Sequence, residues 1–131
     1  MDSKLIHNPR IRQVIEFDGL QYGTITPTDI DGCIEYHDKA VVFMEYKLQG
    51  YGMPDGQKKC LERLTDDITL AGREAVLLLC QHTIYDIWQT VPGKDGKVVG
   101  VYYKGEWHDG NGKTVKWYCD KFFDYIDEGA S

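Results

Sequence analysis

An unbroken apolar run over residues 75–80 (AVLLLC) is the feature that most constrains the fold of this chain. A run of this kind is typical of a β-strand that is buried on both faces. It follows an amphipathic helical pattern over residues 56–71, which itself follows a strand pattern over residues 40–47. Strand, helix and strand in this order predict a βαβ unit, so we expect two parallel strands joined by a right-handed crossover.

The helical pattern carries its own start and stop signals. Pro54-Asp55-Gly56 is typical of a helix start, and Gly72 is typical of a helix end. One stripe of the helix is expected to face the sheet, and the opposite, charged side is expected to face water. The expected stripe consists of Gln57, Cys60, Leu61, Leu64, Ile68 and Ala71, and the charged side of Lys59, Glu62, Arg63, Asp66 and Asp67.

Residues 30–36 and 40–47 have the pattern of two antiparallel strands joined by a tight polar turn, with Asp38 near its apex. Both faces of this hairpin carry apolar side chains, whereas a hairpin exposed on one side would alternate more cleanly. We therefore expect the hairpin to lie in the centre of the sheet, covered on both faces. One face carries Ile30, Ile34, Tyr36, Val42, Met44 and Tyr46, and the other carries Cys33, Val41 and Phe43.

Weaker patterns complete the expected fold. They predict a second hairpin (84–91 with 97–103), a glycine-rich loop (105–112), a closing amphipathic helix (114–126) and an N-terminal hairpin (10–17 with 20–25) around Asp18-Gly19. We expect one α/β domain over residues 1–131, with a core at about 28–82 and a C-terminal hairpin and helix at 84–127. Its central mixed sheet would combine antiparallel hairpins with the parallel βαβ unit, flanked by helices.

The net charge of the chain is −6, which limits the classes of function. It argues against a strong nonspecific DNA-binding surface, because phosphate contacts normally require an excess of Lys and Arg. It argues less against an enzyme whose acids are neutralised by bound divalent cations.

Membrane and disulfide-rich classes are not indicated. No stretch approaches the roughly 20 apolar residues of a membrane span, and the N-terminus lacks the apolar core of a secretory signal. The four cysteines include no Cys-x-x-Cys pair, and Cys33, Cys60 and Cys80 each lie in an apolar pattern. Buried free thiols and a cytoplasmic protein are therefore expected.

Acidic side chains gather at one end of the central hairpin. If its turn is centred on Asp38, then Asp31 lies directly across from Glu45, and Asp29 lies across from Lys47. Directly opposed residues share one face of a sheet, with Cβ atoms about 5 Å apart, whereas a one-residue slip in register would separate them. Charges in such apolar surroundings cost several kcal/mol of desolvation unless they are compensated, which indicates a function.

The chemistry of this set favours a divalent cation. Asp31 and Glu45 offer the hard oxygen ligands that Mg²⁺ or Mn²⁺ prefers. Lys47 follows on the same face of the same strand, where its ammonium could activate water or stabilise developing negative charge. Gln57 begins the helix stripe close to Lys47, and it could bind a phosphate or the water, or simply make a local bond at the helix end.

At these residues the sequence resembles the PD-(D/E)XK nuclease superfamily, over roughly residues 28–80. The matching parts are Thr-Asp-Ile-Asp-Gly at 28–32, Glu-Tyr-Lys at 45–47, and the helix and buried strand that follow. The resemblance implies a restriction-endonuclease-like fold of the small phage or prophage type. It also implies DNA as the nucleic acid that is cleaved.

The resemblance implies particular roles for the matching residues. Asp31, Glu45 and the main-chain carbonyl of Tyr46 would bind Mg²⁺ or Mn²⁺, and Lys47 would assist hydrolysis. Asp29 is the rival of Asp31 for the first role. A long N-terminal helix, which often supplies another acid in this superfamily, is not evident in the sequence, and Glu16 is the one upstream candidate for that acid.

Two functions of different classes follow from these observations. The first is a metal-dependent nuclease that hydrolyses phosphodiester bonds, with a homo-oligomer expected because so small a domain offers little surface to grip a duplex. The second is a noncatalytic, acidic binding protein that keeps the nuclease fold and engages a protein partner. The acid–acid–lysine set favours the first and the acidic net charge favours the second.

Overall fold

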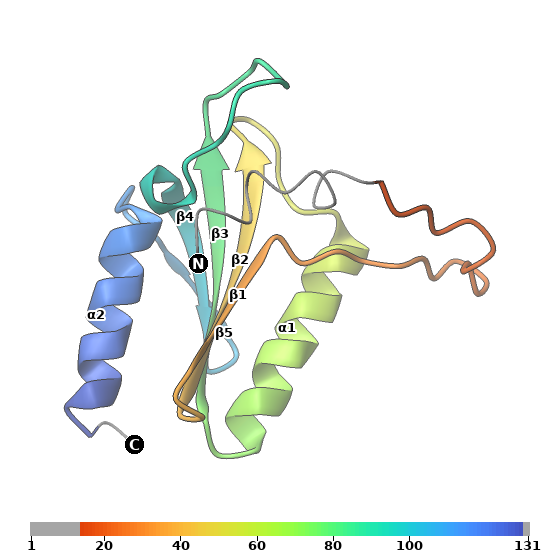
Figure 1. Ribbon diagram of the computed structural model, residues 1–131. Helices are drawn as coiled ribbons and strands as arrows, with labels where there is room; N and C mark the ends of the chain where they lie inside the picture. Colours follow the sequence, from red (N-terminus) through yellow and green to blue (C-terminus); the bar gives the residue numbers. More distant parts are fainter. Residues whose placement is uncertain (1–13, 130–131) are drawn as a thin grey trace.

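The computed structural model describes residues 14–129, which form a five-stranded sheet between two helices (Figure 1). In chain order the elements are β1 (Gly32–Tyr36), β2 (Ala40–Leu48), α1 (Asp55–Leu70), β3 (Glu74–His82), the 3₁₀-helix η3 (Gly93–Asp95), β4 (Lys97–Tyr103), β5 (Glu106–Asp109) and α2 (Val115–Asp127). The spatial order of the strands is β1-β2-β3-β4-β5, so each strand lies beside its neighbour in sequence.

The sheet is mixed, as the sequence predicts. β2 and β3 are parallel over nine residue pairs, from Ala40↔Glu74 to Leu48↔His82, and α1 connects them. The other three strand pairs are antiparallel. The predicted parallel pairing of the two apolar strands is therefore confirmed.

Helix α1 covers one face of the sheet. Its fully buried Leu61 packs against Val41 and Phe43 of β2 and Leu77 of β3. Burying a leucine side chain completely stabilises a fold by about 1.5–3 kcal/mol, so this contact is a main anchor of the helix. Gly72, with φ of +97°, follows the end of the helix as predicted.

The buried stripe of α1 departs from the expected one at Ala71, which is exposed just after the helix ends, and at Leu64. Leu64 is 38% exposed, and Thr65 is buried in its place, one turn after Leu61. The hydroxyl of Thr65 donates to the main-chain carbonyl of Leu61 at 2.7 Å. The helix itself satisfies this polar group, so a threonine can occupy the face that points at the sheet.

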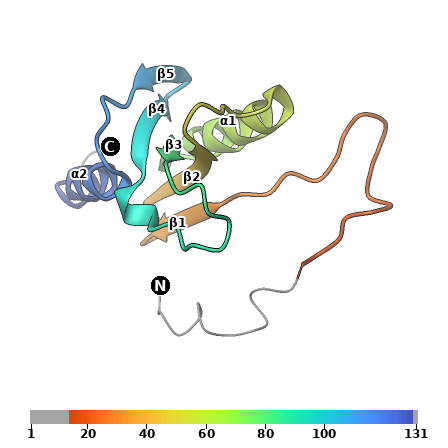
Figure 2. The ribbon, with the colours of Figure 1, turned by 90° about the horizontal axis from the view of Figure 1, so that it is seen from above.

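Helix α2 covers the opposite face, as the view along the strands shows (Figure 2). Its buried side chains Val115 and Cys119 belong to a cluster with Val42, Leu78 and Val98 of the sheet. The helix begins after Thr114, whose side chain accepts a hydrogen bond from the Trp117 N–H at 3.1 Å. The predicted closing helix is confirmed.

The hairpin of β1 and β2 does not lie in the centre of the sheet. β1 is an edge strand whose residues alternate between half-buried and exposed, while residues 40–45 of β2 are all buried. The apolar residues on the two faces of the hairpin misled the prediction, because α1 and α2 both reach β2 and cover it from either side. Cys33 is accordingly exposed, Cys60 is half-buried, and only Cys80 and Cys119 are buried; all four are free thiols.

The predicted second hairpin is wrong in its first strand. Residues 84–91 form no strand, and β4 pairs with β3 instead. Ile87 and Trp88 have a high propensity for β-strands, but their side chains are 85% and 89% exposed and no strand of the described residues packs against them.

The glycine-rich segment contains a strand that was not expected. β5 returns along β4 after the pair Lys104-Gly105, whose φ angles of 49° and 82° fit a tight two-residue hairpin turn. Trp107 of β5 then packs beside Tyr102 of β4, with ring centroids 5.3 Å apart.

The predicted N-terminal hairpin is wrong in its described part. Residues 14–31 contain no strand, and their one ladder contact is an isolated bridge between Tyr22 and Ile25. Asp18-Gly19 does form a turn, with the Leu20 N–H donating to the Phe17 carbonyl at 3.1 Å. Residues 10–13 of the expected first strand lie outside the described residues. Residues 14–31 project from the sheet on the side of α1 (Figures 1 and 2).

Among the described glycines, Gly110 has the least space for a side chain. A Cβ built on it would fall on the carbonyl group of Val98. Two contacts hold the connection between β5 and α2 in place. One is this close approach to Val98, and the other is the hydrogen bond that the Gly110 carbonyl accepts from the Tyr118 hydroxyl at 2.9 Å.

We predict that Gly110→Ala lowers the free energy of unfolding by about 1–3 kcal/mol, because the main chain must move to admit the methyl group. Urea denaturation followed by circular dichroism measures this change. Gly52→Ala is the matched control, since a Cβ at Gly52 meets nothing within 4 Å. Equal stability of the two variants would contradict the prediction.

Candidate metal and phosphate site

The register of the hairpin brings two acids together. Gly32 pairs with Met44 and Tyr36 with Ala40, so the turn is centred on Asp38 as predicted. Asp31 lies one residue before β1, and its main-chain N–H donates to Oε1 of Glu45 at 2.9 Å. The Asp31 carboxylate in turn accepts the Tyr46 N–H at 2.7 Å.

Three side chains form a continuous chain of contacts beside these acids. Nε2 of Gln57 donates to Oε2 of Glu45 at 2.7 Å, and Nζ of Lys47 donates to Oε1 of Gln57 at 2.9 Å. Nζ of Lys47 is 3.9 Å from Oε2 of Glu45. Of the two roles considered for Gln57, a local bond at the helix end and a place in the site, the structure shows contact with the site.

The local fold explains why these residues meet. Glu45 and Lys47 both lie on the face of β2 that α1 covers, because residues two apart on a strand share a face. They follow Phe43, where the apolar contacts with α1 end. The short connection after β2 starts α1 at Asp55, which places Gln57 in its first turn above that end of the strand. The carboxyl end of parallel strands is where open α/β sheets usually place their sites.

The electrostatics of the site leave Glu45 short of positive charge. Its side chain is 0% exposed, and burial is the main reason that the pKa of Glu45 is raised to about 7. The nearby charges of Asp31 and Asp29 also raise this pKa, while the Asp31 N–H and Lys47 lower it. A bound cation would remove the imbalance.

The donor atoms suit a hard divalent cation. Each Glu45 oxygen accepts one hydrogen bond within the chain, and a carboxylate oxygen has two lone pairs, so each keeps one acceptor position. Asp31 is exposed and the Tyr46 carbonyl lies between the two β2 residues of the site. Two carboxylates and a carbonyl fit Mg²⁺ or Mn²⁺, which keep several waters. Within residues 14–129, no group of three or more His, Cys, Asp and Glu side chains is placed to hold a metal.

The two other acids considered from the sequence, both in the described part of the chain, make no hydrogen bond to this pair, although the charge of Asp29 acts on Glu45. Asp29 lines the hollow beside Lys47 and Gln57, whereas Asp31 is the acid bonded to β2 and to Glu45. Glu16 is exposed in the segment before β1 and belongs to no strand or helix.

A hollow of ≈ 730 Å³ opens next to the site. Residues 24–29 form one wall and the first turns of α1 form the other, with Lys47 and Gln57 between them. Lys59 and Arg63 also line this hollow. Helical periodicity places both on the solvent side of the helix, and only their four-residue spacing could have suggested a shared role.

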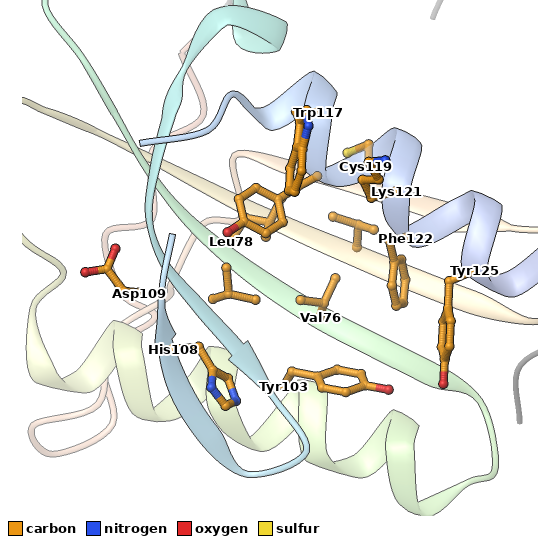
Figure 3. Close-up of a pocket in the computed structure, with 13 residues that line it drawn as sticks. Val76, Leu78, Tyr103, His108, Asp109, Trp117, Cys119, Lys121, Phe122 and Tyr125 are labelled. Carbon is orange, nitrogen blue, oxygen red and sulfur yellow. The ribbon is translucent and has the colours of Figure 1, made fainter. Parts of the chain in front are cut away.

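A second hollow, of ≈ 380 Å³, lies on the other face of the sheet under α2 (Figure 3). Val76, Leu78 and Phe122 contribute to its mostly apolar lining, and Trp117 and Tyr125 lie along its α2 side. The sheet separates it from Asp31, Glu45 and the α1 face.

Comparison of the chain with protein-family models, with curated proteins and with solved structures gives no match. Across residues 14–129, no helix has both the length and the apolar content needed to cross a membrane. The site must therefore be interpreted from its own geometry and chemistry.

We predict that the stability of metal-free Glu45→Gln rises relative to wild type between pH 5 and pH 8, because only the wild type acquires a buried charge over this range. A carboxyl group whose pKa is raised in the folded state stabilises folding fully below its unfolded pKa, and this contribution is lost as pH rises through about 7. The difference in unfolding free energy between variant and wild type should therefore change by up to about 3 kcal/mol in favour of the variant from pH 5 to pH 8.

Thermal unfolding in EDTA at the two pH values tests this prediction. Glu106→Gln is the control, because Glu106 is exposed on β5 and its substitution should change little at either pH. If the stability of Glu45→Gln relative to wild type is the same at the two pH values, the buried charge is better compensated than the geometry indicates.

Proposed function

We propose that the protein is a metal-dependent nuclease with a restriction-endonuclease-like arrangement of its core, hydrolysing phosphodiester bonds of DNA. The contact of Asp31 with Glu45, joined through Gln57 to Lys47, is the observation that carries this proposal. Glu45 and Lys47 lie on one face at one end of β2, and the Asp31 main chain bonds to Glu45 there. Hydrolysis of a phosphodiester needs cation ligands and a proton-handling or charge-stabilising group of this kind.

The residues divide the work between holding and catalysis. Asp31, Glu45 and the Tyr46 carbonyl would hold Mg²⁺ or Mn²⁺, which when bound would polarise the phosphodiester and position the attacking water. Lys47 would stabilise the negative charge that develops on the phosphoryl oxygens, or take part in activating the water. Gln57 would orient Lys47, to which it is already bonded, and contact the phosphate or the water.

The second candidate function is a noncatalytic binding protein, and one observation favours it. Both Glu45 oxygens already accept hydrogen bonds from the chain itself, so the site is satisfied in part without a cation. A chain that had lost catalysis could keep this network as a structural bridge between β2 and α1. Cation binding separates the two candidates directly.

We predict that the protein binds one Mn²⁺ and that Asp31→Asn and Glu45→Gln each weaken this binding at least tenfold, since each removes a carboxylate ligand. Isothermal titration calorimetry measures the affinity. Asp29→Asn is the matched control and should leave the affinity within about twofold, because Asp31 is the acid joined to Glu45. If wild type shows no binding that depends on Glu45, the nuclease proposal fails.

We predict that Lys47→Ala reduces Mn²⁺-supported DNA cleavage by about 10²-fold or more while Mn²⁺ affinity stays within a few-fold of wild type, because the lysine acts on the reaction and not as a ligand. Cleavage of labelled DNA substrates followed by gel electrophoresis provides the rate. Lys39→Ala, at the far end of the same hairpin, serves as the control. Undiminished cleavage by Lys47→Ala would refute the catalytic role of this residue.

A further inference from the structure

We propose that the hollow between residues 24–29 and α1 binds the sugar–phosphate backbone of a single DNA strand and leads it to Lys47, Gln57 and Glu45. This inference rests on the proposed nuclease function and specifies its substrate. Four observations support it: the charge of the hollow, its two walls, its continuity with the site, and the burial of the site carboxylate.

The charge of the hollow is opposite to that of the chain. The chain carries a net charge of −6, yet Lys47, Lys59 and Arg63 line the hollow with Asp29 as the one acid among its lining residues. Positive side chains concentrated along one track supply the phosphate attraction that the overall composition lacks.

Lys59 and Arg63 are available to a ligand. They are exposed, lie one turn apart on α1, and within residues 14–129 neither has a carboxylate within 4 Å of its charged nitrogens. Other basic side chains of the same fold are paired: Arg73 contacts Glu35 at 2.7 Å and Lys116 contacts Asp120 at 2.7 Å. Lys59 and Arg63 thus keep their charges available to a ligand in the hollow.

The shape of the hollow favours a single strand over a duplex. It has a volume of ≈ 730 Å³ and is walled on two sides, by the extended segment 24–29 and by the helix. The segment runs out from the start of β1 on the α1 side (Figures 1 and 2). A single strand can thread between two walls, whereas a duplex is held rigidly at its full width and would rest on their rims.

The depth of the site leads to the same conclusion. Glu45 is 0% exposed and the Lys47 side chain is 23% exposed, so a phosphodiester must enter the hollow to reach them. A positively charged groove that follows the sugar–phosphate backbone is one of the means by which proteins hold single strands without reading sequence. The geometry thus assigns Lys59 and Arg63 to binding the strand and Lys47 to the reacting phosphate.

The test is fluorescence anisotropy in EDTA, with a labelled oligothymidine and a blunt duplex of the same length. We expect the single strand to bind at least tenfold more tightly than the duplex. The double variant Lys59→Ala/Arg63→Ala should weaken single-strand binding at least tenfold and reduce the slope of log affinity against log salt by about 1.4, for two lost phosphate contacts. The control variant Lys116→Ala/Lys121→Ala makes the same change in net charge on α2, across the sheet, and should bind as wild type does.

Three results would overturn the inference: equal or tighter binding of the duplex, unchanged binding in Lys59→Ala/Arg63→Ala, or an equal loss in the control variant. Circular dichroism of each variant ensures that only folded protein is compared. The assay needs neither a metal nor cleavage. If the single strand binds through Lys59 and Arg63 but Mn²⁺ binding does not depend on Glu45, the inference about the hollow stands and the nuclease proposal is refuted. If Lys47 supports cleavage of duplexes and Lys59 and Arg63 are not needed, the nuclease proposal stands and the inference about the hollow is refuted.

Discussion

Two hydrogen bonds and one ion pair compensate the buried carboxylate of Glu45, and they join the three parts of the molecule on which the site depends. Asp31 reaches it from the segment before β1, Gln57 from α1, and Lys47 from the same strand. A buried charge left without such partners would cost several kcal/mol. Asp31 and Gln57 come from segments that are separated in sequence from β2, so their contacts stabilise both the fold and the site.

The parallel pair β2 and β3 determines where this network can form. α1 must return along the sheet to connect them, so its first turn lies above the carboxyl end of β2. Apolar packing holds the helix through Leu61 and ends near Phe43, which leaves Glu45 and Lys47 beneath the first turn of the helix. The apolar contacts and the polar site thus occupy successive stretches of one strand face.

Local signals in the sequence were sufficient where one residue settles a geometry. An odd turn centred on Asp38 places Asp31 opposite Glu45, and Gly72 together with the Pro54 start signal bounds α1 within one residue. Signals failed where the outcome depended on a partner that the sequence does not name. Residues 84–91 have strand-forming side chains but no neighbouring strand, and the edge position of β1 follows from how many strands assemble beyond β2.

The lining of the hollow shows the same limit within the site. Lys59 and Arg63 belong to an ordinary solvent face by helical periodicity, and they acquire a common direction only because residues 24–29 form a wall opposite them. Residues 24–29 have no periodic hydrophobic pattern, so the local sequence does not predict that they form this wall.

The position of β1 at the edge of the sheet, which the sequence did not indicate, determines how exposed the two acids of the site are. A hairpin buried at the centre of the sheet would have enclosed both acids, whereas here Asp31 is exposed at the start of an edge strand while Glu45 is buried on its inner neighbour. The pair therefore has one protected side and one open side. The open side lies where the segment before β1 departs, which is also where Asp29, Lys47 and Gln57 face the hollow. The proposed function is compatible with an acidic chain for this reason, because a nucleic-acid ligand would meet only this one locally basic approach and not the average surface.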